Sequence, residues 1–116
     1  MAPFGGGMGS TGQVCGTLSG GLAVIGFTLG KTEAKGRDHK LMWKLSYQMV
    51  QEFSKICADY NGTDCRDIAG VNWQNHIAVL HFYKAPDSSR KNCVKVIRAT
   101  SDYLNALITE HFPPEK

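Results

Sequence analysis

The sequence predicts an all-α fold: a small bundle of about four helices preceded by a glycine-rich loop. Apolar residues recur at steps of three and four over long stretches, which is the period of an amphipathic helix. Eleven of the thirteen glycines fall within the first 36 residues, so the chain is expected to open with an element dominated by backbone. A length of 116 residues suits one core but not two. We therefore expect one domain over residues 1–112 and a frayed tail at 113–116.

The expected elements follow from this period and from its interruptions. Residues 4–12 contain five glycines and no apolar period, which predicts a loop. Helices are expected at 13–30, 38–60, 64–69 and 90–108. The clearest apolar stripe belongs to the second helix, for which Asp38 is the candidate N-cap. Residues 71–83 mix apolar and polar side chains without a clean period, so we expect a partly packed loop with about one helical turn there.

Three glycines recur every four residues near the start of the first helix: Gly12, Gly16 and Gly20. Each glycine in a helix is less favourable than alanine by about 1 kcal/mol. The usual compensation is that another helix or a ligand approaches the backbone closely. The spacing therefore predicts a tight contact along this glycine face.

Composition excludes several functions. A net charge of +3, from 13 basic and 10 acidic residues, is too small for a duplex nucleic-acid binder. The apolar stretch 14–29 is interrupted by glycines and is shorter than the roughly 20 residues of a membrane span. No basic residue precedes it, unlike in a signal peptide, so a cytoplasmic location is expected. In that compartment four cysteines are metal ligands, reactive thiols or small hydrophobes rather than permanent disulfides.

Three cysteines fall in the first turns of three different predicted helices: Cys15, Cys65 and Cys93. The unpaired amides of a helix N-terminus favour an anion, which can lower a thiol pKa and make the sulfur a better nucleophile or metal ligand. Burial as a small hydrophobe is the alternative for each of them. Cys57 lies near the C-terminal end of its helix, where packing is the simpler interpretation. The turn at Gly62 nevertheless leaves its sulfur able to meet that of Cys65.

Other motifs carry less information. No C-x-x-C occurs, which counts against thioredoxin-type exchange and zinc ribbons. The glycines Gly5, Gly6 and Gly7 precede a helix, but no Walker lysine follows, so this loop is expected to wrap the sulfur site and offer N–H donors rather than to hold phosphate. The histidines show no metal-ligand spacing, and surface or packing roles are favoured, with a fourth-ligand or supporting role left open for two of them. They are His39, His76, His81 and His111.

Several of these residues resemble the motifs of a known family, the redox-active C_GCAxxC proteins. The resemblance rests on the loop 4–9, on Cys15 to Gly26 with its CGAxxG-like start, on Cys65 to Gly70, which is similar to C-R-x-L-x-G, and on Cys93. Thr17 and Ile68 depart from the pattern. The resemblance implies a small helical protein with redox or metal-linked work, similar to a domain that carries an iron–sulfur centre in some multi-cofactor cytochromes. The family carries a further cysteine on a helix before the loop, and here either that helix is missing or Cys57 takes its place.

These observations lead to one main hypothesis and two alternatives. The main one is an iron–sulfur or other metal–thiolate centre for electron transfer, with Cys15, Cys65 and Cys93 as ligands and Cys57, a histidine or a partner as the fourth. Backbone around the site would come from Gly5, Gly6, Gly7 and Gly16. The alternatives are a thiol–disulfide oxidoreductase or redox sensor, and an interaction protein with a structural zinc. The expected partner is a redox protein or an oxidoreductase complex, and a homo-oligomer is left open.

Overall fold

The protein is a helical bundle with a compact cap at one end. The computed structural model describes residues 4–30, 36 and 40–111. Within these residues it contains α1 (Gly16–Leu29), α2 (Leu41–Ile56), α3 (Cys65–Ala69), α4 (His76–Lys84) and α5 (Arg90–His111). The only extended pairing in that part of the chain is an isolated bridge between Val14 and Asp64. The all-α prediction is confirmed.

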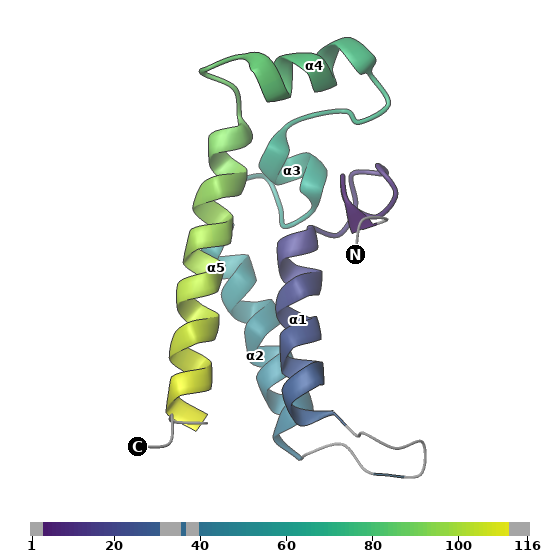
Figure 1. Cartoon of the computed structure of the whole chain (residues 1–116). Coiled ribbons are helices and arrows are strands. Elements are labelled where there is room, and N and C mark those ends of the chain that lie inside the picture. Colours follow the sequence, from purple (N-terminus) through teal and green to yellow (C-terminus); the bar gives the residue numbers. More distant parts are fainter. Residues whose placement is uncertain (1–3, 31–35, 37–39, 112–116) are drawn as a thin grey trace.

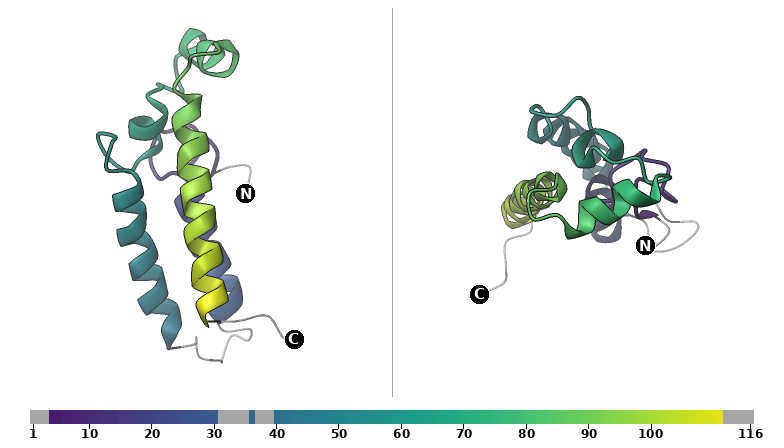
Figure 2. Two further views of the ribbon diagram at one scale, coloured as in Figure 1. Left: turned by 90° about the vertical axis from the view of Figure 1, so that its left-hand side faces the viewer. Right: turned by 90° about the horizontal axis from the view of Figure 1, so that it is seen from above.

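The three long helices α1, α2 and α5 lie side by side, and α3, α4 and the glycine loop gather at one end of them (Figures 1 and 2). From that end α1 runs away, α2 returns and α5 runs away again (Figure 1). The N-terminus of α1 and the C-terminus of α2 therefore lie at the end next to α3, and α5 begins beyond them, beside α3 and α4 (Figures 1 and 2). This chain direction decides where the cysteines lie.

Apolar stripes on the three long helices form the core. At the far end of the bundle the buried cluster consists of Ile25, Leu29, Leu45, Met49 and Leu107. Nearer the cap it continues as Phe53, Cys57, Ile68 and Val96. A third cluster, formed by Ala69, Val71 and Phe82, joins α4 to the rest of the cap. Removal of these side chains from water is the main force that holds the helices together.

Helix ends match the predicted ranges to within a few residues. Helix α2 is described from Leu41, since the candidate cap Asp38 lies outside the described residues, as does the tail 113–116. Helix α3 begins with a capping box in which the side chains of Asp64 and Asp67 each accept a backbone N–H. It ends at Gly70, which has a left-handed φ of 63°.

The interpretation of residues 71–83 as a loop is wrong, because α4 spans His76–Lys84. Asn75 begins this helix: its Oδ1 accepts a hydrogen bond from the backbone N–H of Ala78 at 3.1 Å. Phe82 is the buried residue of the helix, whereas Ile77 is 79% exposed and Leu80 is 41% exposed. Apolar side chains thus surround α4, and this hides the helical period.

The predicted close contact along Gly12, Gly16 and Gly20 is found only at Gly12, which lies in the loop before α1 and where a Cβ would be 3.1 Å from Arg66 Cβ in α3. A Cβ on Gly20 would meet nothing within 4 Å, and one on Gly16 would only touch the Phe4 carbonyl oxygen at 3.9 Å. Within α1 the close approach is at Gly21, where a Cβ would lie 2.6 Å from Met49 Cε. The side of α1 that faces the bundle is chosen by its large apolar residues, and Gly21 lies on that side with Ile25 and Leu29.

Candidate thiol site

All four cysteines lie at the cap end of the bundle, because each is at the end of a helix that starts or finishes there. Cys15 is the N-cap of α1, and Cys57 is the C-cap of α2. Cys65 is the first residue of α3, and Cys93 lies in the first turn of α5. The structure therefore brings Cys15, Cys65 and Cys93 together as N-terminal residues of three helices, and it adds Cys57 to them. All four are free thiols.

The chain that leads into Cys15 is tied to the chain that leads into Cys65. The Cys65 backbone N–H donates to the Gln13 carbonyl oxygen at 2.6 Å, and the Arg66 N–H donates to the Gly12 oxygen at 3.0 Å. The bridge between Val14 and Asp64 continues this pairing. These hydrogen bonds hold the starts of α1 and α3 together although the two helices begin far apart in the sequence, at Gly16 and Cys65.

The glycine loop packs directly on Cys65. Gly7 is buried with a φ of 74°, and a Cβ there would lie 2.7 Å from Cys65 Cβ and 2.5 Å from the Gln13 nitrogen. Only glycine fits at this position. Gly5 and Gly6 accept hydrogen bonds from within the loop, and Gly16 is exposed on α1. The loop therefore covers the Cβ side of Cys65, mainly through Gly7.

The loop uses many of its own donors. The backbone N–H groups of Met8, Ser10, Thr11, Gly12 and Gln13 all donate to carbonyl oxygens inside the loop. Met8 and Ser10 have left-handed φ values of 66° and 62°, a conformation that costs a residue with a side chain about 1 kcal/mol or more. The expected donation of loop N–H groups to sulfur thus does not involve these five amides.

Burial dominates the ionisation of the thiols. Burial, followed by negative charge on Cys15, raises the pKa of Cys57 to about 11. Burial, followed by charge on Cys65 and Cys15, raises the pKa of Cys93 to about 11 as well. Burial also raises the pKa of Cys65, partly offset by a hydrogen bond from Trp73. A lowered pKa was expected at these helix N-termini, and for Cys65 and Cys93 this expectation is wrong because the loss of water around a thiolate outweighs the attraction of the amides.

The same effects describe how near the thiols are to one another. A charge on Cys15 raises the pKa of Cys57, Cys65 and Cys93, so each of these three thiols lies within electrostatic reach of Cys15. Cys15 and Cys93 also pack against the cluster that contains buried Cys57. Among the described residues no three His, Cys, Asp or Glu side chains are positioned as ligands of one metal ion. His76 and His81 are exposed on α4, His111 ends α5, and His39 lies outside the described residues.

Trp73 is a site residue that the sequence analysis did not identify. Its indole N–H donates to the sulfur of Cys65, with a nitrogen to sulfur distance of 3.3 Å. It lies in the segment that was expected to be a loop, eight residues after Cys65. The only signal in the sequence was a large amphipathic side chain shortly after the turn at Gly70.

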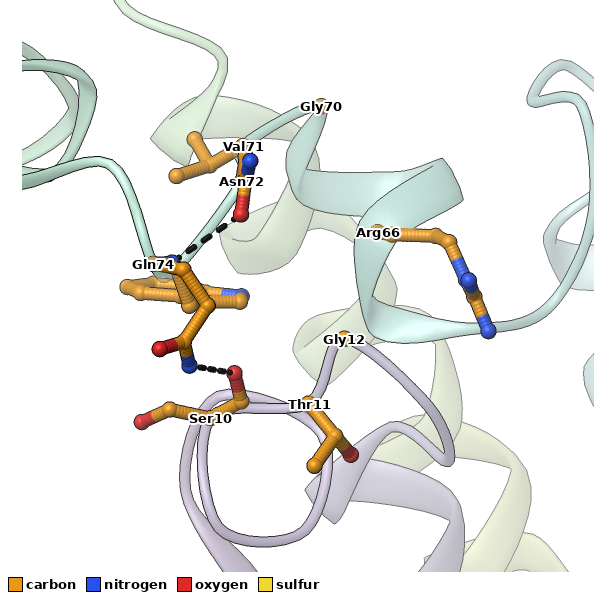
Figure 3. A pocket seen from close by; sticks show the side chains of 9 residues that line it. Ser10, Thr11, Gly12, Arg66, Gly70, Val71, Asn72 and Gln74 are labelled. Carbon is orange, nitrogen blue, oxygen red and sulfur yellow. Dashed lines mark hydrogen bonds between the residues drawn. The ribbon is translucent and has the colours of Figure 1, made fainter.

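A pocket of about 550 Å³ opens beside this contact, between the glycine loop, α3 and the segment 70–74 (Figure 3). The side-chain amide of Gln74 donates to the Ser10 carbonyl oxygen at 3.0 Å across it, and Arg66 supplies a cation at its edge. The pocket gives solvent a route to the vicinity of Trp73 and to the outer face of α3.

Comparison with known proteins identifies a family for this chain. A family model described as "Putative redox-active protein (C_GCAxxG_C_C)" matches residues 1–107. The chain belongs to this family. No curated protein and no solved structure matches it. The C_GCAxxG_C_C pattern names two cysteines after the glycine-flanked one, and this chain has three there; Cys65 and Cys93 are at helix N-termini and partly exposed, whereas Cys57 is buried.

One further property follows from the helix lengths. Among residues 4–30, 36 and 40–111, no helix is both long enough and apolar enough to cross a bilayer.

Proposed function

We propose that this member of the redox-active family is an electron-transfer module in which Cys15, Cys65 and Cys93 bind an iron–sulfur cluster or another metal ion. The observation that carries the proposal is the convergence of these three cysteines, from three helix N-termini, at one end of the bundle. Three sulfur donors suit the thiolate-preferring metals and iron–sulfur clusters. An iron–sulfur cluster supplies reversible one-electron transfer when it is bound.

The surrounding residues have features that such a centre needs. Gly7 brings backbone against Cys65 where no side chain fits, which keeps water from that side. The buried residues Phe53, Ile68 and Val96 pack with Cys15, Cys57 and Cys93 and lower the local polarity. Thiols in such surroundings resist losing their protons alone, and a cation among them compensates the charge of their thiolates. Binding requires the cysteine side chains to rotate toward a common point, and the fourth ligand comes from Cys57 or from a partner.

Thiol–disulfide chemistry is the second candidate. It is favoured by four free thiols at one end of the bundle, each of which lies within electrostatic reach of another. In this case two of the thiols would be oxidised to a disulfide by a cellular disulfide and reduced again by a dithiol partner. An interaction protein with a structural zinc is the third candidate, because zinc accepts the same sulfur ligands.

The first experiment is anaerobic purification followed by a visible absorption spectrum and by analysis of iron, acid-labile sulfide and zinc. Visible absorption with iron and sulfide supports the cluster, and zinc alone supports the third candidate. Replacement of Cys15, Cys65 or Cys93 by Ser should each deplete the iron. Cys57→Ala is the matched thiol deletion and should leave most of it. Equal loss in Cys57→Ala would make Cys57 the fourth ligand.

Alkylation separates electron transfer from thiol chemistry. In the loaded protein Cys15, Cys65 and Cys93 should resist iodoacetamide until a chelator or acid removes the metal. Exposed catalytic thiolates would react quickly at neutral pH. Rapid alkylation of two of these cysteines in protein never exposed to air, with no iron detected, would contradict the metal proposal and favour the thiol–disulfide candidate.

A further inference from the structure

Trp73 contacts the thiol site without being one of its cysteines. An indole ring has one N–H donor and no acceptor, so the direction of its hydrogen bond to Cys65 is fixed. In the part of the chain that the structure describes, Cys65 is the one cysteine whose sulfur accepts a hydrogen bond from a side chain. The contact therefore distinguishes Cys65 from Cys15 and Cys93.

The indole is held in place from several sides. Its ring packs edge-on against Phe82, with centroids 5.2 Å apart, and is tilted against Tyr83 at 6.2 Å. It also packs on the buried cluster of Ala69, Val71 and Phe82. Aromatic pairs at these separations contribute about 1 kcal/mol beyond the area they bury. The ring is thus fixed by packing that does not depend on the hydrogen bond to sulfur.

The backbone on either side of the ring is fixed as well. The Gln74 N–H donates to Asn72 Oδ1 at 3.0 Å, and the Gln74 side-chain amide reaches the Ser10 carbonyl oxygen at 3.0 Å (Figure 3). These two hydrogen bonds fasten the residues before and after Trp73, one of them to the glycine loop. The donor is therefore presented to Cys65 with little freedom to turn away.

We infer that Trp73 is a positioning residue for Cys65, and that its N–H hydrogen bond stabilises extra negative charge on this sulfur. Hydrogen bonds to cysteine sulfur are one of the factors that set the reduction potential of a thiolate-bound centre. The reduced form carries more negative charge on its sulfurs, so the indole N–H favours it. The inference rests on the proposed function for its effect on a bound centre, but the contact itself and its effect on the Cys65 thiol do not require a metal.

The first test is the reduction potential of the loaded protein. Trp73→Phe keeps an aromatic ring against Phe82 and Tyr83 but removes the N–H. Its midpoint potential should become more negative than that of the parent. Trp43→Phe is the matched control, since Trp43 is 72% exposed on α2, and it should leave the potential unchanged. Equal potentials in the parent and in Trp73→Phe, with metal content retained, would overturn the inference.

The second test needs no metal. The chain has two tryptophans, so Trp43→Phe protein reports the fluorescence of Trp73 alone. A thiol sulfur in contact with an indole quenches its emission. Cys65→Ala in this background should therefore brighten the emission, whereas Cys57→Ala, which removes a thiol that does not contact the indole, should not. No brightening by Cys65→Ala, or equal brightening by both, contradicts the contact.

A third measurement applies if the purified protein binds no metal, a result that would itself refute the metal proposal. In a glutathione buffer, the Cys65 thiol and oxidised glutathione exchange to give a mixed disulfide and one reduced glutathione. The indole N–H donates to the sulfur of reduced Cys65, and the sulfur of a disulfide is a weaker acceptor. Trp73→Phe should therefore show a larger fraction of mixed disulfide at Cys65 than Trp43→Phe at the same buffer ratio. Mass spectrometry of the peptide that contains Cys65 measures this fraction. Equal fractions would overturn the inference even where the metal proposal has already failed.

Discussion

Two adjacent glycines in α1 should respond in opposite ways to the same substitution. Gly20 faces open space and Gly21 faces Met49, whose side chain is fully buried. Alanine at either position gains helix propensity of about 1 kcal/mol relative to glycine. At Gly20 nothing offsets this gain. At Gly21 the new Cβ would lie 2.6 Å from Met49 Cε and 3.4 Å from Leu104 Cδ1, so the terminal methyl group of Met49 must move although its side chain is fully buried. Overpacking of this kind costs about 1–3 kcal/mol.

Both variants gain the same helix propensity, so the difference between their free energies of unfolding measures the cost of the contact with Met49. Gly21→Ala should be less stable than Gly20→Ala by about 1–3 kcal/mol, and its melting temperature should be lower by about 4 °C or more. Urea unfolding followed by circular dichroism at one pH measures both free energies. If Gly21→Ala is as stable as Gly20→Ala, Met49 moves at no cost and the tight approach of α1 to α2 at this residue is not a packing constraint.

Three further results are expected. Thr100 is 2% exposed, and its Oγ1 has no hydrogen-bond partner among the described residues. Thr100→Val should therefore stabilise the protein by about 1 kcal/mol. The control Thr109→Val, on the exposed side of α5, should change the free energy of unfolding by less than about 0.5 kcal/mol. Burial raises the pKa of Cys57 in the folded protein from 9.0 to about 11. In metal-free protein the thiol therefore ionises at lower pH in the unfolded chain than in the folded one. Its contribution to the free energy of unfolding is complete below pH 9 and declines by at most about 2–3 kcal/mol as the pH rises toward 11. Urea unfolding across this pH range should therefore show a smaller decline in Cys57→Ala, and an equal decline would contradict the assigned burial. Asn75→Ala removes the N-cap of α4 and should destabilise this helix by about 1 kcal/mol. Amide hydrogen exchange in α4 should then be faster than in the parent protein, while exchange in α5 stays the same. Unchanged exchange in α4 would mean that the cap is not needed.

The helix positions could be predicted wherever one face of a helix is apolar. Helix α2 has a single buried stripe of Leu45, Met49 and Phe53, and this produces a clean period in the sequence. Helix α4 has Phe82 as its buried residue but exposes Ile77, Leu80 and Tyr83, so its period is lost. What starts α4 is a local hydrogen bond that the cap Asn75 accepts from the Ala78 N–H, rather than an apolar pattern.

The sequence by itself determined that the protein is helical, that a glycine loop precedes the first helix, and that three cysteines lie at helix N-termini, because these features depend on local spacing and on capping. Tertiary packing decided the rest. It selected Gly21 rather than Gly16 or Gly20 for the close contact, because the large apolar side chains of α1 choose which face turns inward. It buried Cys57 beside the other thiols and placed the indole of Trp73 on Cys65, since both depend on the direction in which each helix enters the cap. It also reversed the expected pKa direction of Cys65 and Cys93, because desolvation depends on the neighbours that folding brings and not on the residues adjacent in sequence.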